Sequence, residues 1–213
     1  MPEPAALPAL PGALRTPQQA RSREKVARIL AATARLLEEL PPDELGTKLI
    51  AAEAGVSIGV LYRFFPDKQA IIVALAADWL EQFVSIAEQA VADPLPADPA
   101  ELTGRLLDAH AGFRREQPGF QRLWYGSMPW AALREEDERN DRELAELIRG
   151  ALVRGYGYPD TPEFGRRTHL AVKAAGQLLN LAFEQDPQGD PGILAELRLM
   201  LERWVLGRSV TQG

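Results

Sequence analysis

The residues best suited to a specific chemistry lie in two short predicted helices, 47–54 and 58–65, which meet at a turn around Gly55. Glycine readily adopts the left-handed backbone conformation that a tight turn between two helices requires. Ser57 follows at a position where its hydroxyl can cap the second helix. This arrangement predicts a helix-turn-helix, in which the first residues of the second helix meet base edges in the major groove of DNA.

A small apolar core must hold these two helices together. Ala51 and Ala54 are small enough to let the helices approach, and Val56 and Leu61 close the core between them. Upstream, apolar residues recur at helical spacing from 23 to 40 and predict a preceding helix. We therefore expect a three-helix unit to position the residues that face DNA.

Few side chains could support catalysis or metal binding. The sequence has no cysteine, which excludes disulfides, thiolate metal sites and a cysteine nucleophile. Its two histidines, His110 and His169, lie far apart, and it has neither a Ser-containing nucleophile elbow nor a phosphate-binding glycine loop. The acidic run at 135–138 is interpreted as a solvated helix face. We expect no catalytic residue, no metal, no cofactor and no enzyme activity.

Charge is distributed unevenly along the 213 residues, whose net charge is −6. Residues 1–70 carry nine Lys/Arg and eight Asp/Glu, whereas residues 71–213 carry fifteen and twenty-two. Attraction to phosphate is screened within about 10 Å, so a basic N-terminal face can bind DNA while an acidic remainder faces away. The distribution permits DNA binding, although a short basic run is also typical of a solvated helix.

Periodicity and helix breaks predict an all-α protein, without alternating β-strand patterns or internal repeats. Asp98-Pro99, Thr161-Pro162 and Asp190-Pro191 each place a capping side chain before a proline, which predicts a helix start, and Glu101 can complete a capping box. The expected helical segments are 23–40, 47–54, 58–65, 68–90, 98–117, 120–125, 130–153, 161–185 and 191–206.

No run of 18 or more apolar residues is present that would predict a membrane helix. Residues 1–18 are rich in Ala, Leu and Pro and lack a basic segment before the apolar part, so they indicate a flexible arm rather than a signal peptide. We expect a cytoplasmic bacterial protein with no membrane partner.

Residues 28–75 resemble the N-terminal region of the tetracycline-repressor (TetR/AcrR) family of bacterial transcription regulators. The resemblance implies a helix-turn-helix DNA-binding domain at 19–67 and a larger helical domain at 68–213 for effector binding and dimerisation. Gly46 departs from the family, which usually has a capping Thr or Ser there, and this leaves Thr47 to supply the hydroxyl. The matching elements are Ile29-Leu30-Ala31-Ala32, Thr47, Ile50-Ala51, Ala54-Gly55-Val56-Ser57, Leu61-Tyr62 and Phe65-Pro66-Asp67-Lys68.

The same resemblance implies that Tyr62 contacts a DNA phosphate and that Lys68 anchors another, although a core tyrosine and a free surface lysine are the plain alternatives. The first turn of the second helix is unusually apolar, so direct hydrogen bonding to bases is expected to be sparse. Thymine methyl contacts and DNA shape would then carry specificity, with Lys48 or Arg63 reaching a guanine. The predicted DNA-binding residues are Thr47, Lys48, Ser57, Ile58, Gly59, Val60, Tyr62, Arg63, Phe64 and Lys68.

Aromatic residues of the larger part gather around the helix breaks near 118–130. Most such clusters are plain core, but by the family resemblance they are also candidates to line an effector pocket. His110, one turn before Phe113, is a candidate polar group to orient a ligand, which we expect to be largely apolar or aromatic. The predicted ligand-binding residues are Trp79, Phe83, His110, Phe113, Trp124, Tyr125, Met128 and Trp130.

The predicted helix 161–185 has an apolar arc too wide for packing against one neighbour. Together with the last helix it predicts half of an intersubunit four-helix bundle, and thus a homodimer. The predicted interface residues are Ala171, Ala174, Ala175, Leu178, Ala182, Leu197, Leu201 and Trp204.

The sequence therefore predicts a ligand-responsive, homodimeric transcriptional repressor. It would bind a pseudo-palindromic operator in double-stranded DNA and release it when a small apolar effector binds. The alternatives are a regulator that activates or has no effector, and a helical protein with a vestigial DNA-binding motif that acts as an enzyme or as a protein-binding adaptor.

Overall fold

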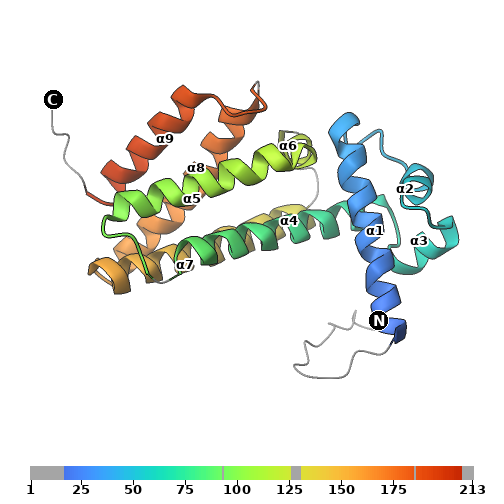
Figure 1. Ribbon diagram of the computed structural model, residues 1–213, viewed down its shortest axis with the longest axis horizontal. Helices are drawn as coiled ribbons and strands as arrows, with labels where there is room; N and C mark the ends of the chain where they lie inside the picture. Colours follow the sequence, from blue (N-terminus) through green and yellow to red (C-terminus); the bar gives the residue numbers. More distant parts are fainter. Residues whose placement is uncertain (1–16, 93, 126–130, 185, 208–213) are drawn as a thin grey trace.

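The computed structural model describes residues 17–92, 94–125, 131–184 and 186–207. All regular secondary structure in these ranges is α-helical, which confirms the predicted fold class (Figure 1). Residues 1–16 of the predicted arm lie outside the described residues. The helices are α1 (Pro17–Glu39), α2 (Thr47–Glu53), α3 (Ile58–Phe64), α4 (Lys68–Ala90), α5 (Pro99–Glu116), α6 (Pro118–Tyr125), α7 (Ala131–Tyr156), α8 (Pro162–Glu184) and α9 (Pro191–Trp204).

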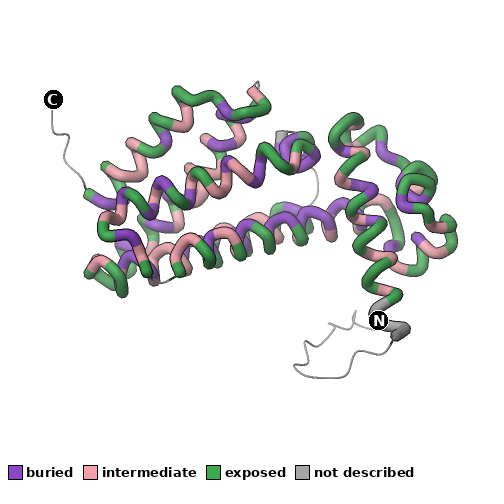
Figure 2. The backbone as a smooth tube through the Cα atoms, viewed as in Figure 1, coloured by how far each residue is buried: buried purple, intermediate pink, exposed green. Residues whose placement is uncertain are grey.

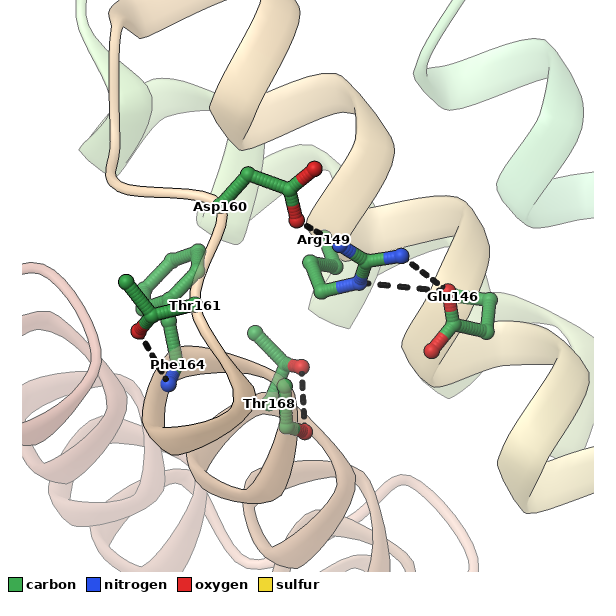
Figure 3. Close-up of polar contacts among 7 residues, drawn as sticks. Glu146, Arg149, Asp160, Thr161, Phe164 and Thr168 are labelled. Atoms are coloured by element: carbon green, nitrogen blue, oxygen red, sulfur yellow. Dashed lines mark hydrogen bonds and ion pairs between the residues drawn. The ribbon is translucent and has the colours of Figure 1, made fainter.

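The predicted helix starts are confirmed by their caps. Asp98 and Asp190 each accept hydrogen bonds from backbone N–H groups of the turn that follows, at 2.8–3.0 Å. Thr161 does the same for α8 at 3.2 Å (Figure 3). Glu101, the residue predicted to complete a capping box at the start of α5, pairs with Arg105 one turn later, at 2.6 Å.

The helices α1, α2 and α3 form one end of the molecule and share a buried core (Figure 1). Ile29 of α1, Ile50 of α2 and Leu61 of α3 are all fully buried in it. Helices shorter than about 12 residues are marginal in water on their own, so α2 and α3 depend on this core. The small core predicted around Val56 and Leu61 is thereby confirmed.

The long helix α4 connects this end to the rest of the chain (Figure 1). Ile71 packs in the core of the first three helices, while Ile72 and Trp79 are buried in the next core along the helix. By length and composition alone, α4 contains a stretch of 18 residues apolar enough to cross a membrane, with a mean hydropathy of 1.6 over that stretch. Here it packs against α1, α5 and α7, and its buried side faces those helices (Figure 2).

The corner between α7 and α8 is held by polar contacts at the surface. Arg149 pairs with Asp160 in the connection and with Glu146 one turn earlier on α7 (Figure 3). Tyr156 and Tyr158 add hydrogen bonds from their hydroxyls to the backbone oxygens of Pro96 and Leu206, at 2.7 and 3.1 Å. These contacts position α8 beside α7, where both helices line a cavity.

Candidate DNA-binding surface and effector cavity

The turn between α2 and α3 has the conformation that the sequence predicts. Gly55 has a φ of +62°, in the left-handed region that favours glycine. Ser57 caps α3, since its hydroxyl oxygen accepts a hydrogen bond from the backbone N–H of Val60 at 3.3 Å. Both features orient α3 so that its first turn lies on the surface.

Two hydroxyl groups pair across this unit. The Oη of Tyr62 on α3 lies 3.0 Å from the Oγ1 of Thr47, the first residue of α2. Thr47 therefore does not cap α2 as expected, and the N-cap residue Gly46 makes no side-chain capping bond. The pair joins the two helices on an exposed face, because half of Tyr62 is accessible to solvent.

The remaining predicted DNA-binding residues of α2 and α3 lie on or near the surface. Lys48, Ile58 and Gly59 are exposed, and Val60 is half-buried. Arg63 is exposed as well, and its guanidinium carbon lies 5.1 Å from the centre of the Phe64 ring. The structure thus brings these residues together on two adjacent helices, and their contact with DNA stays a prediction.

Lys68 has a different environment from the rest. Its ammonium donates hydrogen bonds to the backbone oxygens of Pro42 and Asp43, at 3.0 and 3.1 Å. These contacts fasten the start of α4 to the connection between α1 and α2. Lys68 is thereby a positioning residue of the N-terminal unit, and a phosphate contact of its ammonium stays a prediction.

A cavity of about 150 Å³ lies in the larger part of the chain. Side chains from α4 through α9 surround it, and its wall is largely apolar, with leucines such as Leu102, Leu106 and Leu144. The hydroxyl of Thr168 also lines it but donates to the backbone oxygen of Gly165 at 3.0 Å (Figure 3). Space and apolar surface of this kind are typical of a site for a small ligand.

Three of the predicted ligand-binding residues line this cavity, namely Phe83, His110 and Trp124. Trp79 and Phe113 are buried in the aromatic core beside it. The side chain of Tyr125 and the whole of Met128 and Trp130 lie outside the described residues.

His110 contributes a neutral polar group to the cavity wall. Burial among apolar side chains, with a further contribution from the nearby charge of Arg114, lowers its pKa to about 4. Its Nδ1 lies 2.9 Å from the backbone oxygen of Leu106. A carbonyl oxygen only accepts, so Nδ1 carries the proton and Nε2 is left as an acceptor.

Two stacked aromatic rings of α6 line the cavity. Phe120 stacks on Trp124 with ring centroids 4.2 Å apart. The indole N–H of Trp124 donates to Asp137 on α7 at 3.3 Å. Burial, followed by the charge of Asp141 one turn away, raises the pKa of the Asp137 carboxyl. This end of the cavity is therefore an aromatic wall with a carboxyl group at its edge.

Sequence reasoning missed two groups of polar side chains, one joining α5, α6 and α8 and the other joining α7 and α8. Arg114 is buried and donates to the amide oxygens of Gln121 and Asn180, at 3.1 and 2.8 Å. Lys173 pairs with Glu138 and Asp141 across α7 and α8, at 2.6 and 3.1 Å. Only the fold brings Arg114 and Asn180 together, since 66 positions separate them.

The outer face of α8 and α9 carries exposed apolar side chains. Leu170 and Leu181 are 52% and 50% exposed, and Trp204 is 43% exposed. Leu170 and Leu181 are eleven positions apart, which is three turns, so they lie on one side of α8. Both leucines belong to the apolar arc from which the sequence predicts the interface, although the list of predicted interface residues does not include them.

The other predicted interface residues divide into two groups. Ala174, Ala175, Leu178 and Leu201 are half-buried. Ala171, Ala182 and Leu197 are buried in the chain's own core, which corrects their assignment to an outer face. The wide apolar arc of α8 thus packs mostly inward, and only a narrow stripe faces outward.

Two parts of the chain match known families. Residues 29–75 match the family described as "Bacterial regulatory proteins, tetR family". Residues 97–206, just over half of the chain, match "Tetracyclin repressor-like, C-terminal domain".

Individual relatives agree with these matches. The HTH-type transcriptional regulator EthR of Mycolicibacterium smegmatis is 30% identical over 81% of this chain and 84% of its own length. A crystal structure of a TetR-family transcriptional regulator from Streptomyces coelicolor is 32% identical, with a TM-score of 0.73 over 89% of this chain and 99% of that one. The fold alone is shared with the regulator FadR from Bacillus subtilis in complex with stearoyl-CoA, which is 17% identical, with a TM-score of 0.65 over 86% of this chain and 99% of that one.

Proposed function

The chain belongs to the TetR family of bacterial regulatory proteins, whose members are ligand-responsive, DNA-binding transcriptional repressors, and we propose how its parts divide this work. The exposed face of α2 and α3 binds the operator, and the cavity among α4–α9 binds the effector. The homodimer forms through the outer stripe of α8 and α9, which we define by the exposed residues Leu170, Leu181 and Trp204. The family assignment favours this reading over an enzyme or an adaptor with a vestigial motif. Binding to chromosomal DNA would place the protein in the cytoplasm.

The observation that carries the DNA-binding proposal is the Thr47–Tyr62 hydroxyl pair, exposed beside Lys48 on the helix-turn-helix. Hydroxyl and lysine side chains at such a position are suited to phosphate oxygens. We expect the ammonium of Lys48 to attract DNA phosphates in a salt-dependent way. We expect the hydroxyl of Tyr62, oriented by Thr47, to form a hydrogen bond with a phosphate oxygen.

The test measures binding of the full chain to DNA upstream of its own gene, by fluorescence anisotropy over a range of salt concentrations. Lys48→Ala should weaken binding and lower the salt slope by about one for each half-site contact. Tyr62→Phe should weaken binding while the ring stays in place. Arg154→Ala, which removes an exposed cation from α7, is the matched control and should leave both quantities unchanged. Wild-type affinity and slope in both test variants would contradict the proposed surface.

The effector proposal is supported by the route from the cavity to the DNA-binding unit. Leu80 and Phe83 of α4 line the cavity, and Ile71, three turns earlier on the same helix, packs in the core of α1–α3. A ligand that displaces α4 would therefore change how that unit is held. A release of operator requires that the ligand bind the released state more tightly, because equal affinity for both states changes nothing.

The proposed ligand is small and largely apolar or aromatic, with a donor that can meet Nε2 of His110. A screen of hydrophobic compounds by tryptophan fluorescence tests this, because Trp124 lines the cavity. Hits should release operator DNA from the wild type and lose their signal in Trp124→Leu. Hits that bind but leave the operator complex intact would contradict the release mechanism.

A further inference from the structure

The DNA-facing unit exposes large apolar side chains where solvent-exposed helices usually carry polar ones. Among the described residues, Leu49 of α2 is 42% exposed and Ile58 of α3 is 38% exposed. A reading surface of this kind differs from one built on Arg, Asn or Gln, which hydrogen-bond to base edges.

The first turn of α3 presents a mainly apolar surface and no side chain that could hydrogen-bond to a base edge. It consists of Ile58, Gly59 and Val60. The oxygen of the preceding Ser57 is engaged in capping, and the guanidinium of Arg63, in the last turn, lies over the Phe64 ring. Hydrogen-bonding groups are therefore sparse at the end of α3 that enters the groove in a helix-turn-helix.

Gly59 adds open space to this apolar turn. A Cβ placed on Gly59 would have no heavy atom within 4 Å, and its backbone is ordinary helix. Glycine in a helix is destabilising by up to about 1 kcal/mol relative to alanine, and no packing inside the chain requires it here. The missing side chain thus leaves room on the outer side, where DNA would approach.

On this basis we propose that the first turn of α3 recognises thymine C5-methyl groups in the operator. Among the four bases, only thymine presents a methyl group in the major groove, next to its O4 acceptor, whereas the other bases present hydrogen-bonding groups and C–H edges without a methyl. An apolar side chain against one of those edges would remove water from a polar group without replacing its hydrogen bond, which is unfavourable. Ile58 contacts the methyl, and the space beside Gly59 admits it. The inference rests on the proposed operator binding and adds which bases are read.

The experiment selects duplexes that bind the full chain from a randomised pool and then replaces each thymine of one half-site with deoxyuridine. This change removes only the methyl group and keeps base pairing. At the thymines that Ile58 reads, the affinity should fall about fourfold, the factor expected for burying one methyl group. Substitution by 5-methylcytosine should bind better than substitution by cytosine at the same positions, because it restores the methyl.

Two variants separate methyl recognition from general binding. Ile58→Ala should bind the thymine and deoxyuridine duplexes nearly equally, whereas Lys48→Ala should weaken both and keep the ratio between them. Gly59→Ala should fold as the wild type does and still lose affinity for the thymine duplex, since the added methyl occupies the space beside the helix.

The inference is overturned if the chain binds selected duplexes tightly and no deoxyuridine substitution lowers the affinity. It is also overturned if Ile58→Ala keeps the wild-type ratio. If no duplex is enriched over random DNA, the proposed operator binding itself fails and the inference fails with it, an outcome distinct from tight binding without methyl discrimination.

Discussion

The two ends of the molecule use apolar residues in opposite ways. In α1–α3 the core is small, and apolar side chains such as Ile58 remain on the surface beside the Thr47–Tyr62 pair. In α4–α9, aromatic residues such as Phe83 and Trp124 are buried around a cavity, which polar groups such as Arg114 and Asn180 also line. The proposed function accordingly assigns operator binding to the surface of the first region and effector binding to the interior of the second.

Within the second region, the outer stripe of α8 differs because its apolar side chains face solvent. Of the substitutions considered, a charge placed in this stripe should reduce dimerisation and operator affinity the most. Leu181→Glu, or Leu178→Glu beside it, would bury an unpaired carboxylate in a dimer interface, at a cost of several kcal/mol. Sedimentation should then show monomers. Operator affinity should collapse, because two recognition helices must lie about 34 Å apart to meet successive major grooves.

Ala132→Glu places the same charge on an exposed alanine of α7 and should leave the dimer intact. If the Leu181→Glu variant remains dimeric and binds the operator normally, the dimer interface does not include this part of α8.

Alanine substitutions at two glycines, Gly119 and Gly59, test the difference between a closely packed position and an open surface position. A Cβ on Gly119 would lie 2.7 Å from the backbone oxygen of Ala34, so Gly119→Ala should force α6 away from α1. Overpacking of this kind costs about 1–3 kcal/mol, measurable by urea unfolding. Gly59→Ala is the control, and it should leave stability unchanged or slightly raised. Equal stability of the two variants would contradict the close packing of α6 on α1.

Acidic pH should lower the free energy of unfolding through a cavity-lining group of the second region, His110. His110 has a pKa of about 4 in the folded chain, against an ordinary histidine pKa of 6.5, so the folded state binds fewer protons between these values. Stability is therefore lost as the pH falls through this window, by about 2 kcal/mol between pH 7 and pH 5. His110→Gln should remove this part of the pH dependence in urea unfolding. An unchanged pH profile in the variant would show that His110 titrates normally.

A substitution of Lys68 is expected to lower stability the least of these test variants. It also tests whether the DNA-binding surface extends to the start of α4. Lys68→Met removes two hydrogen bonds to the connection between α1 and α2, which should lower stability by about 1 kcal/mol. If Lys68 acts by positioning, operator binding weakens and its salt slope stays the same, in contrast to Lys48→Ala. A slope that falls by about one would instead place the ammonium of Lys68 on a phosphate.

The local features of this protein follow from short stretches of its amino-acid sequence. The helix starts at Asp98, Thr161 and Asp190, the left-handed Gly55 and the cap at Ser57 all follow from residues within a few positions of one another. Such features depend on backbone preferences and on hydrogen bonds within a single turn, so periodicity and residue type are sufficient to predict them. The motif from 28 to 75 is local in the same sense and was sufficient to indicate the family.

Contacts between side chains that are distant in sequence depend on how the helices pack. The Thr47–Tyr62 pair and the bonds of Lys68 to the preceding connection join residues 15 to 26 positions apart. On α8, periodicity predicted a wide apolar arc but not that Ala171 and Ala182 turn inward while Leu170 and Leu181 face outward. A helical pattern specifies how far around the helix apolar residues extend. Which part of that arc is buried depends on where the neighbouring helices lie, and that is set by packing between segments distant in sequence.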